Sequence, residues 1–226
     1  MMHTVFFDAG GTLITGTTTL TLLAQRLDHQ RKDEIFEFMR QNFMRLYLDE
    51  NPPQFYTIKE LLTLCASLAV RHFHLPDIDY DIVGYYRRTH LQNDRLYDDT
   101  LPTLKRLREK GIRLILISDA DADVLLEQLE IFGISEYFDG KIISSQTCSY
   151  KPSDKTVKEA LRYCHEPLSG ILLVGDTVVD IKTAQKMGVK SALISRTNDF
   201  KLDTHYKIAS LFQVINIISE TKDDFS

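Results

Sequence analysis

Short apolar runs alternate with segments of helical periodicity over the second half of the chain. The runs are almost continuously apolar and rich in β-branched residues, whereas apolar residues in the other segments return every three or four positions. This alternation is typical of a parallel sheet whose two faces are covered by helices. The predicted strands are 112–117, 141–143, 171–174 and 191–194, with 214–217 as a candidate for the last one. The predicted helices lie near 101–107, 125–132, 157–164 and 181–187.

The first part of the chain has one further strand and then a long helical block. Residues 4–7 form an apolar run that ends on Asp8 and leads into a loop of small residues, 9–12. From about residue 17 to 95, four amphipathic segments follow one another without a strand. We therefore expect an α/β fold, a doubly wound, Rossmann-like parallel sheet with an inserted all-helical cap domain. The predicted boundaries are 1–15 and 96–226 for the core domain and 16–95 for the cap domain.

Length, charge and cysteine content narrow the class of protein. A chain of 226 residues is long enough for one core domain with an insertion. The net charge of −5 and the absence of a basic run argue against a protein that binds nucleic acid. No segment reaches the roughly 18 apolar residues of a membrane helix, and the chain does not start with a signal-peptide pattern. The three cysteines show no Cys-x-x-Cys spacing, so we expect a cytoplasmic protein.

Polar residues stand at or after the ends of several predicted strands. Asp8, Ser118 and Asp176 come at strand ends, Asp180 follows four residues later, and Lys151 lies in the loop after another strand. Taken alone, each has an ordinary structural interpretation as a turn residue, a helix N-cap or a solvated lysine. In a doubly wound sheet, however, ligands bind outside the carboxyl ends of the strands, where these residues would meet.

Together, these residue types are typical of a site for phosphoryl transfer. Three carboxylates at one sheet edge repel one another unless a cation lies between them, and Mg²⁺ is the usual ion where phosphate is also bound. A lysine, a hydroxyl group and backbone N–H groups at a helix N-terminus suit a phosphoryl group. An aspartate beside them is able to act as a covalent nucleophile and form an aspartyl phosphate.

Four motifs, in this order, carry a resemblance to a known family. They are Phe6-Phe7-Asp8-Ala9-Gly10-Gly11-Thr12-Leu13, Ile117-Ser118-Asp119, Tyr150-Lys151-Pro152 and Val174-Gly175-Asp176-Thr177-Val178-Val179-Asp180. The sequence resembles the haloacid dehalogenase (HAD) superfamily of hydrolases, in the branch with a helical cap inserted after the first strand. The resemblance extends to about residue 217.

The resemblance implies a role for each motif residue. Asp8 is expected to be the catalytic nucleophile, and Lys151 is expected to neutralise it and to contact the phosphoryl group. The implied phosphate-binding residues are Gly10 and Gly11, through backbone N–H groups, Ser118 and Lys151. The implied Mg²⁺ ligands are Asp8, the Gly10 carbonyl, Asp176 and Asp180, the last directly or through water.

One position departs from the family pattern. Phosphatases of this family usually carry a second aspartate two residues after the nucleophile, which protonates the leaving group and then activates water. This chain has Gly10 there, and such an acid–base group typically contributes about 10²–10⁴-fold in rate. Three consequences are open: a preference for acyl phosphates or anhydrides, a proton supplied by another residue such as His90 or Asp119, or slow hydrolysis of the aspartyl phosphate.

Two branches that lack this acid offer alternatives. Haloacid dehalogenases need no metal, so the presence of Asp176 and Asp180 argues against dehalogenation. Phosphonoacetaldehyde hydrolases need a cap lysine as a Schiff base, and Lys59 lies in the predicted cap, although a lysine on a helix surface is usually solvated.

The predicted function is a Mg²⁺-dependent hydrolase of a small-molecule phosphate ester or anhydride. The alternatives are a catalytically weakened binding or regulatory protein of the same fold and a phosphonate or haloacid hydrolase. A small phosphorylated substrate is the expected partner, nucleic acid and membranes are not, and the chain is expected to be a monomer or homodimer. The sequence does not identify the substrate.

Overall fold

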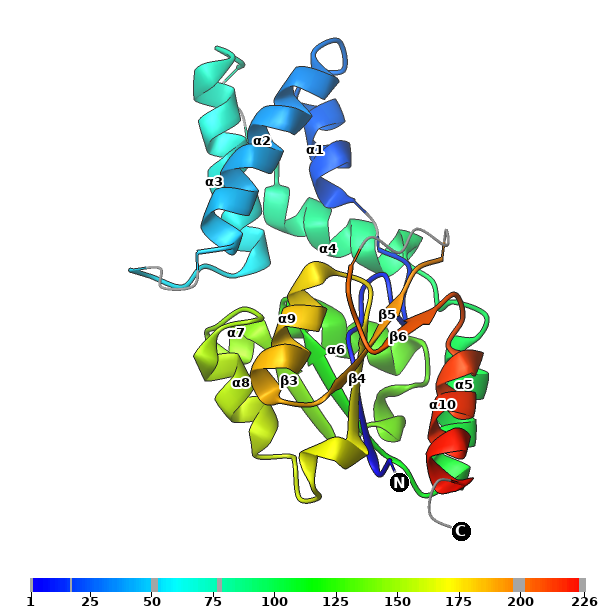
Figure 1. Ribbon diagram of the computed structural model, residues 1–226. Helices are drawn as coiled ribbons and strands as arrows, with labels where there is room; N and C mark the ends of the chain where they lie inside the picture. The colour runs from blue at the N-terminus through cyan, green and yellow to red at the C-terminus, as the bar shows by residue number, and fades with distance from the viewer. Residues whose placement is uncertain (1, 17, 50–52, 77–78, 197–201, 224–226) are drawn as a thin grey trace. The chain divides into compact units, whose positions relative to one another are not determined.

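The computed structural model describes residues 2–16, 18–49, 53–76, 79–196 and 202–223. The chain divides into two compact units (Figure 1). The core unit is the chain up to Thr15 and from Arg95 onward, and the helical unit is Gly16–Asp94. The helical unit covers nearly the same stretch as the predicted cap, and its status as a domain of its own stays a prediction.

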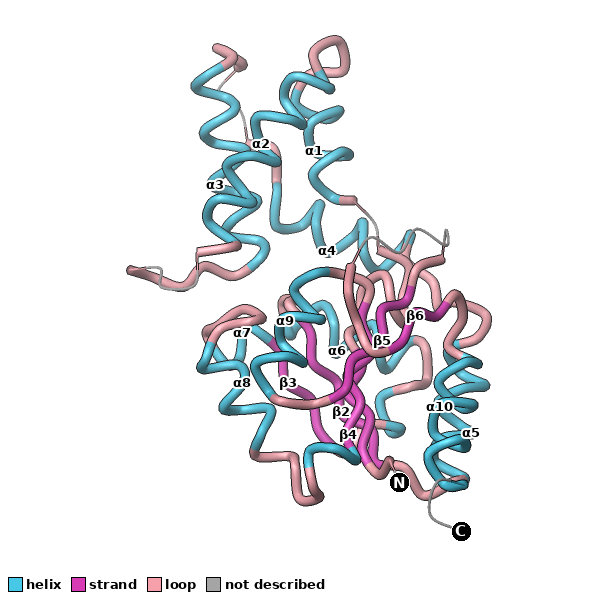
Figure 2. Tube along the Cα trace, in the orientation of Figure 1, coloured by secondary structure: helices cyan, strands magenta, loops and turns pink. Residues whose placement is uncertain are grey.

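The core unit is built on a six-stranded parallel sheet in the order β3-β2-β1-β4-β5-β6 (Figure 2). The strands are β1 (Thr4–Phe7), β2 (Arg113–Ser118), β3 (Gly140–Ile143), β4 (Ile171–Gly175), β5 (Lys190–Ile194) and β6 (Tyr206–Ile208). In the centre, Phe6 pairs with Ile115 on one side and with Leu173 on the other. The order reverses at β1, which is where a doubly wound sheet opens a crevice at its carboxyl edge.

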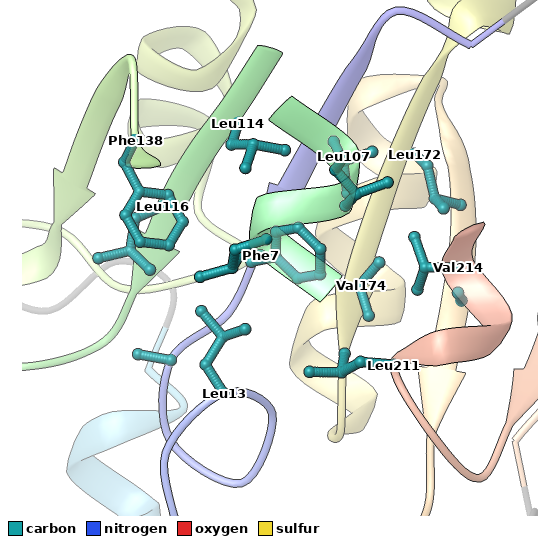
Figure 3. Packing of buried hydrophobic residues seen from close by; sticks show 14 of the residues in the cluster. Phe7, Leu13, Leu107, Leu114, Leu116, Phe138, Leu172, Val174, Leu211 and Val214 are labelled. Atoms are coloured by element: carbon teal, nitrogen blue, oxygen red, sulfur yellow. The ribbon is translucent and has the colours of Figure 1, made fainter. Parts of the chain in front are cut away.

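Helices cover both faces of the sheet, as the continuous apolar strands predict. The α-helices of the core unit are α5 (Thr100–Glu109), α6 (Ala122–Ile131), α7 (Ser144–Thr147), α8 (Asp154–Leu161), α9 (Val178–Met187) and α10 (Phe212–Asp223). Phe7 belongs to a buried cluster with residues of α5, α6 and α10, part of which is shown in Figure 3. Its neighbour Phe6 points the other way, into a cluster with residues of α8 and α9. The predicted α/β sheet with inserted helices is confirmed.

The predicted last strand at 214–217 is wrong, because this segment lies within α10. Val214 and Ile217 are buried three positions apart while Asn216 between them is exposed, which is helical periodicity. The short apolar run that suggested a strand contains two isoleucines and one valine, but contact with the sheet decides its conformation. The sixth strand is β6, which the sequence did not reveal.

The helical unit consists of α1 (Thr19–Leu27), α2 (Lys32–Tyr47), α3 (Ile58–His72) and α4 (Ile82–Asn93). Its buried residues include Leu23, Ile35 and Leu61, which come from three of these helices. No helix in the described ranges is both long and apolar enough to cross a membrane.

Candidate active site

The chain brings the predicted site residues to the carboxyl edge of the three central strands. Asp8 directly follows β1, and its N–H donates to the Val174 carbonyl at 2.9 Å, so strand pairing fixes its backbone. Ser118 is the last residue of β2, and Asp176 directly follows β4. Ser118 is buried at this edge, and its contact with a phosphoryl group stays a prediction.

Lys151 bridges two carboxylates in the interior. Its Nζ lies 2.7 Å from Asp8 Oδ1 and 2.6 Å from Asp180 Oδ1, and the lysine side chain is only 4% exposed. A third hydrogen bond, 3.4 Å long, runs from Nζ to the Ile117 carbonyl at the end of β2. A buried ammonium is costly unless it is paired, and these three acceptors offset the loss of its hydration.

The start of α9 fixes the position of Asp180. Its Oδ2 accepts hydrogen bonds from the Thr177 N–H at 3.0 Å and the Thr177 hydroxyl at 2.6 Å, which forms a capping box at the helix N-terminus. Gly175 leaves room for this carboxylate, because a Cβ there would lie 2.3 Å from Asp180 Cγ. The Gly-Asp-x-x-x-Asp spacing therefore places two acids on either side of a helix start.

Asp8, Asp176 and Asp180 form a cluster of acids, of which Asp8 and Asp180 are buried and Asp176 is half-buried. One ligand oxygen from each lies within 4.8 Å of the others. Asp176 Oδ1 is buried and has no hydrogen-bond partner among the described residues. Gly11, with φ +79°, permits this packing, because a Cβ at that position would lie 2.1 Å from Asp176 Oδ2.

Burial and crowding disfavour the charged state of two of these acids. Burial raises the pKa of Asp8 from 3.8 to about 8, with the Asp180 and Asp176 charges adding to the rise and Lys151 opposing it. Burial also raises the pKa of Asp176, to about 6, and the neighbouring Asp180 contributes. One ammonium does not compensate three carboxylates. An oxygen-only cluster with an unpartnered buried oxygen fits a hard divalent cation such as Mg²⁺.

The loop after Asp8 is held by hydrogen bonds between its own backbone groups. The Gly11 N–H donates to the Ile14 carbonyl at 2.7 Å, so it is already used within the loop. The Leu13 and Ile14 N–H groups both donate to the Ala9 carbonyl, at 2.8 and 2.9 Å. Gly11 forms a tight turn beside Asp176, and the contacts of the Gly10 and Gly11 backbones with phosphate stay predictions.

Two further residues support the site, Asp119 in a role that the sequence did not indicate and Arg196, which sequence reasoning did not place there. Asp119 Oδ1 accepts the backbone N–H of Lys151 at 3.0 Å and so fixes the loop that carries the ammonium. Arg196 donates to the Thr12 carbonyl at 2.9 Å and to Asp99 Oδ2 at 2.6 Å. In the sequence, Arg196 is simply a charged residue just after the apolar run of β5. Such residues are usually solvated, so its role could not be recognised.

The sequence model of the haloacid dehalogenase-like hydrolase family matches residues 2–188. The chain belongs to this family. The membership predicted from the four motifs is confirmed, and the chain is an enzyme of the HAD hydrolase type.

Curated relatives of this HAD hydrolase include phosphatases of two kinds. Pyrophosphatase PpaX of Bacillus pumilus is 27% identical over 84% of this chain and 82% of that protein. The phosphoglycolate phosphatase of Aquifex aeolicus is 25% identical over 85% of this chain and 84% of that protein. The chain is thus similar to hydrolases that act on different phosphorylated molecules.

Solved structures show the same fold at lower identity. The L-2-haloacid dehalogenase of Xanthobacter autotrophicus is 14% identical, with a TM-score of 0.74 over 97% of this chain and 99% of that one. The HAD hydrolase YfnB of Bacillus subtilis, bound to magnesium, is 18% identical, with a TM-score of 0.74 over 96% of this chain and 98% of that one. At these identities, the likeness concerns the fold alone.

The raised pKa of Asp8 predicts how stability depends on pH in the metal-free HAD protein. Between its ordinary value of 3.8 and about 8, the folded state keeps a proton on Asp8 that the unfolded chain has lost. The free energy of unfolding therefore falls as pH rises through this range. Thermal unfolding in EDTA should show a steeper loss of Tm toward about pH 8 for the wild type than for Asp8→Asn, whose amide does not titrate. Parallel curves for the two proteins would contradict this assignment.

Proposed function

We propose that this HAD hydrolase is a Mg²⁺-dependent phosphohydrolase that cleaves a small-molecule phosphate ester or anhydride through a phosphorylated Asp8. The observation that carries the proposal is the buried cluster in which Lys151 joins Asp8 to Asp180 beside Asp176. The pyrophosphatase and phosphoglycolate phosphatase relatives support a phosphorylated substrate.

The residues of the cluster divide the chemistry among them. One Asp8 oxygen attacks the phosphorus atom, and the Lys151 ammonium, 2.7 Å from Asp8 Oδ1, stabilises negative charge that gathers there. Ser118 and the Gly10 N–H are proposed to hold the phosphoryl oxygens. Water then attacks the phosphorus, and the Asp8 carboxylate is released.

The acids are proposed to hold the metal ion in two ways. Asp8, Asp176 and the Gly10 carbonyl would bind it directly, since the Asp176 Oδ1 oxygen has no other partner among the described residues. Asp180 Oδ1 accepts a hydrogen bond from Lys151, and Oδ2 accepts one from Thr177. Because both oxygens are already used, we propose that Asp180 contacts the ion through water. When bound, Mg²⁺ would neutralise the phosphoryl oxygens as a Lewis acid.

Hydrolysis of acetyl phosphate and p-nitrophenyl phosphate, measured with Mg²⁺ and with EDTA, tests this proposal. We expect removal of the ion to lower kcat/KM by on the order of 10²-fold, because the ion supplies several kcal/mol of charge stabilisation. Mg²⁺ should also raise the Tm of the wild type, and this rise should be absent in Asp176→Asn.

The alternatives give different results in the same experiment. Turnover that is indifferent to Mg²⁺ would contradict the metal role of Asp176 and Asp180 and favour a metal-independent hydrolase. A folded protein that binds Mg²⁺ but turns over neither substrate would favour the binding or regulatory protein, for which the glycine at position 10 is the motivating observation.

A further inference from the structure

Gly10 has no side chain, and the space that a side chain would occupy at this position, two residues after Asp8, is open. A Cβ atom built on Gly10 meets no heavy atom within 4 Å, apart from its chain neighbours, among the described residues. The adjacent Gly11 differs sharply, because a Cβ there would lie 2.1 Å from Asp176 Oδ2. Within the core unit, room for a proton-donating side chain is therefore present two residues after Asp8.

Asp119, one of the two residues that could replace the missing donor, already has a positioning role. Its Oδ1 accepts the Lys151 backbone N–H at 3.0 Å. This contact holds the loop that delivers the Lys151 ammonium to Asp8. The carboxylate thus serves the site by accepting a hydrogen bond from the protein.

His90, the other candidate, has partners at both ring nitrogens. Nδ1 lies 2.7 Å from Asp94 Oδ2, and Nε2 lies 2.9 Å from the Thr19 hydroxyl. These contacts join the first residue of α1 to the end of α4. A histidine that donates to a leaving group needs one nitrogen directed at the substrate, and both nitrogens of His90 are directed at its own unit.

Lys151 and Asp180 are likewise engaged with each other, and Asp176 is proposed to bind the metal ion. Lys151 donates to Asp8, to Asp180 and to the Ile117 carbonyl. Asp180 accepts from Lys151 at one oxygen and from Thr177 at the other. If either group gave up its place to protonate a leaving group, a buried charge would lose its partner.

We propose, on the basis of the function proposed above, that the substrates of this enzyme are acyl phosphates and phosphoric anhydrides, whose leaving groups depart as stable anions without a proton from the enzyme. The observation that carries this is the open position at Gly10 together with the engagement of Asp119 and His90. Because the enzyme has no acid for the leaving group, it is restricted to substrates whose leaving group needs no proton.

The reaction balances without a general acid in its first step. A bond forms between an Asp8 oxygen and phosphorus as the bond from phosphorus to the leaving oxygen breaks. That oxygen keeps the electron pair and departs as a carboxylate or phosphate anion. In the second step, water adds to phosphorus, the electron pair of the broken bond returns to Asp8, and the proton of the water passes to phosphate or to solvent.

The acidity of the leaving group decides how much an enzyme acid would help. Carboxylic acids have a pKa of about 4, phosphate monoanions about 6 and phenols about 10, and the pKa of water lies well above these. Carboxylate and phosphate anions are stable at neutral pH, whereas an alkoxide is not. An enzyme without the acid should therefore lose rate steeply as the leaving group becomes more basic.

The test is kcat/KM of the wild type, with Mg²⁺, for acetyl phosphate, p-nitrophenyl phosphate, phenyl phosphate and glycerol phosphate. We expect a fall on the order of 10²-fold or more from the first to the last. Gly10→Asp should raise the rate for glycerol phosphate, relative to the rate for acetyl phosphate, by on the order of 10²-fold. Gly10→Asn is the matched control, because it fills the same space and has no acidic proton.

Each result has a defined meaning. A steep dependence that Gly10→Asp flattens and Gly10→Asn does not would support the inference. Similar wild-type rates for all four substrates would overturn it and leave the proposed phosphohydrolase function standing. Equal effects of Gly10→Asp and Gly10→Asn would also overturn it. The new side chain would then act by filling space or by changing the loop conformation, and not by donating a proton. No turnover of any phosphate would overturn the proposed function itself, and this inference with it.

Discussion

Asp8→Asn should reduce turnover of acetyl phosphate by at least about 10⁴-fold, because loss of a covalent nucleophile removes the whole pathway that depends on it. The amide has nearly the same volume as the carboxylate but is not nucleophilic enough to attack phosphorus. The backbone at this position is fixed by strand pairing with Val174, so the fold should be retained. Steady-state kinetics with Mg²⁺, beside far-ultraviolet circular dichroism, measures both expectations.

The same Asp→Asn change at an exposed position of the core unit is the control for the loss of one carboxylate. Asp154 has a side chain that is 97% exposed and is paired loosely with Lys186 at 3.3 Å. Asp154→Asn should keep turnover close to the wild-type value. Acid-quenched wild type should carry phosphate on Asp8 in mass spectra, and Asp8→Asn should not. An Asp8→Asn protein with turnover within about tenfold of wild type would exclude Asp8 as the nucleophile.

Lys151→Met should impair both stability and turnover. Removal of the ammonium leaves Asp8 and Asp180 buried together without a cation, and an unpaired buried charge costs about 3–5 kcal/mol of unfolding free energy. Turnover should fall by on the order of 10³-fold, since one preorganised charge at a reacting centre is worth this much. Urea unfolding and kcat for acetyl phosphate give the two quantities.

A second variant separates the two effects of Lys151. In the double variant Lys151→Met/Asp180→Asn, one of the two carboxylates that faced the ammonium is neutral, so part of the lost stability should return. Turnover should remain low, because the positive charge beside Asp8 is still missing. Recovery of turnover together with stability would show that Lys151 acts only through the fold.

Local order in the sequence was enough to predict five of the six strands and which polar residues follow them. The central strands contain continuous apolar runs, and a polar residue of the candidate site follows at the end, as Asp8 follows 4–7 and Asp176 follows the run before Gly175. In a parallel sheet, the carboxyl ends share one edge, so the order of elements alone places these residues together. The short run at 214–217 failed this logic because its three apolar residues fit either periodicity, and their burial in the core cluster goes with the helix.

Contacts that depend on the direction of a single group could not be predicted in the same way. The hydrogen bond from Asp119 to the Lys151 backbone, the donation of the Gly11 N–H to Ile14 and the use of both His90 nitrogens depend on directions of single groups. Composition and periodicity carry no information on such directions. For this reason His90 and Asp119 were open candidates for the missing acid until their partners were known.

The sequence by itself determined which groups this protein possesses: a nucleophilic aspartate, two further acids, a lysine, and a glycine where an acid is expected. The tertiary structure decided what those groups do to one another. Lys151 and Asp8 are 143 positions apart in the chain, yet their charged atoms meet at 2.7 Å in the interior. The low dielectric of the interior strengthens each ion pair and hydrogen bond there. Groups that are held by such contacts are not free to transfer a proton to the substrate.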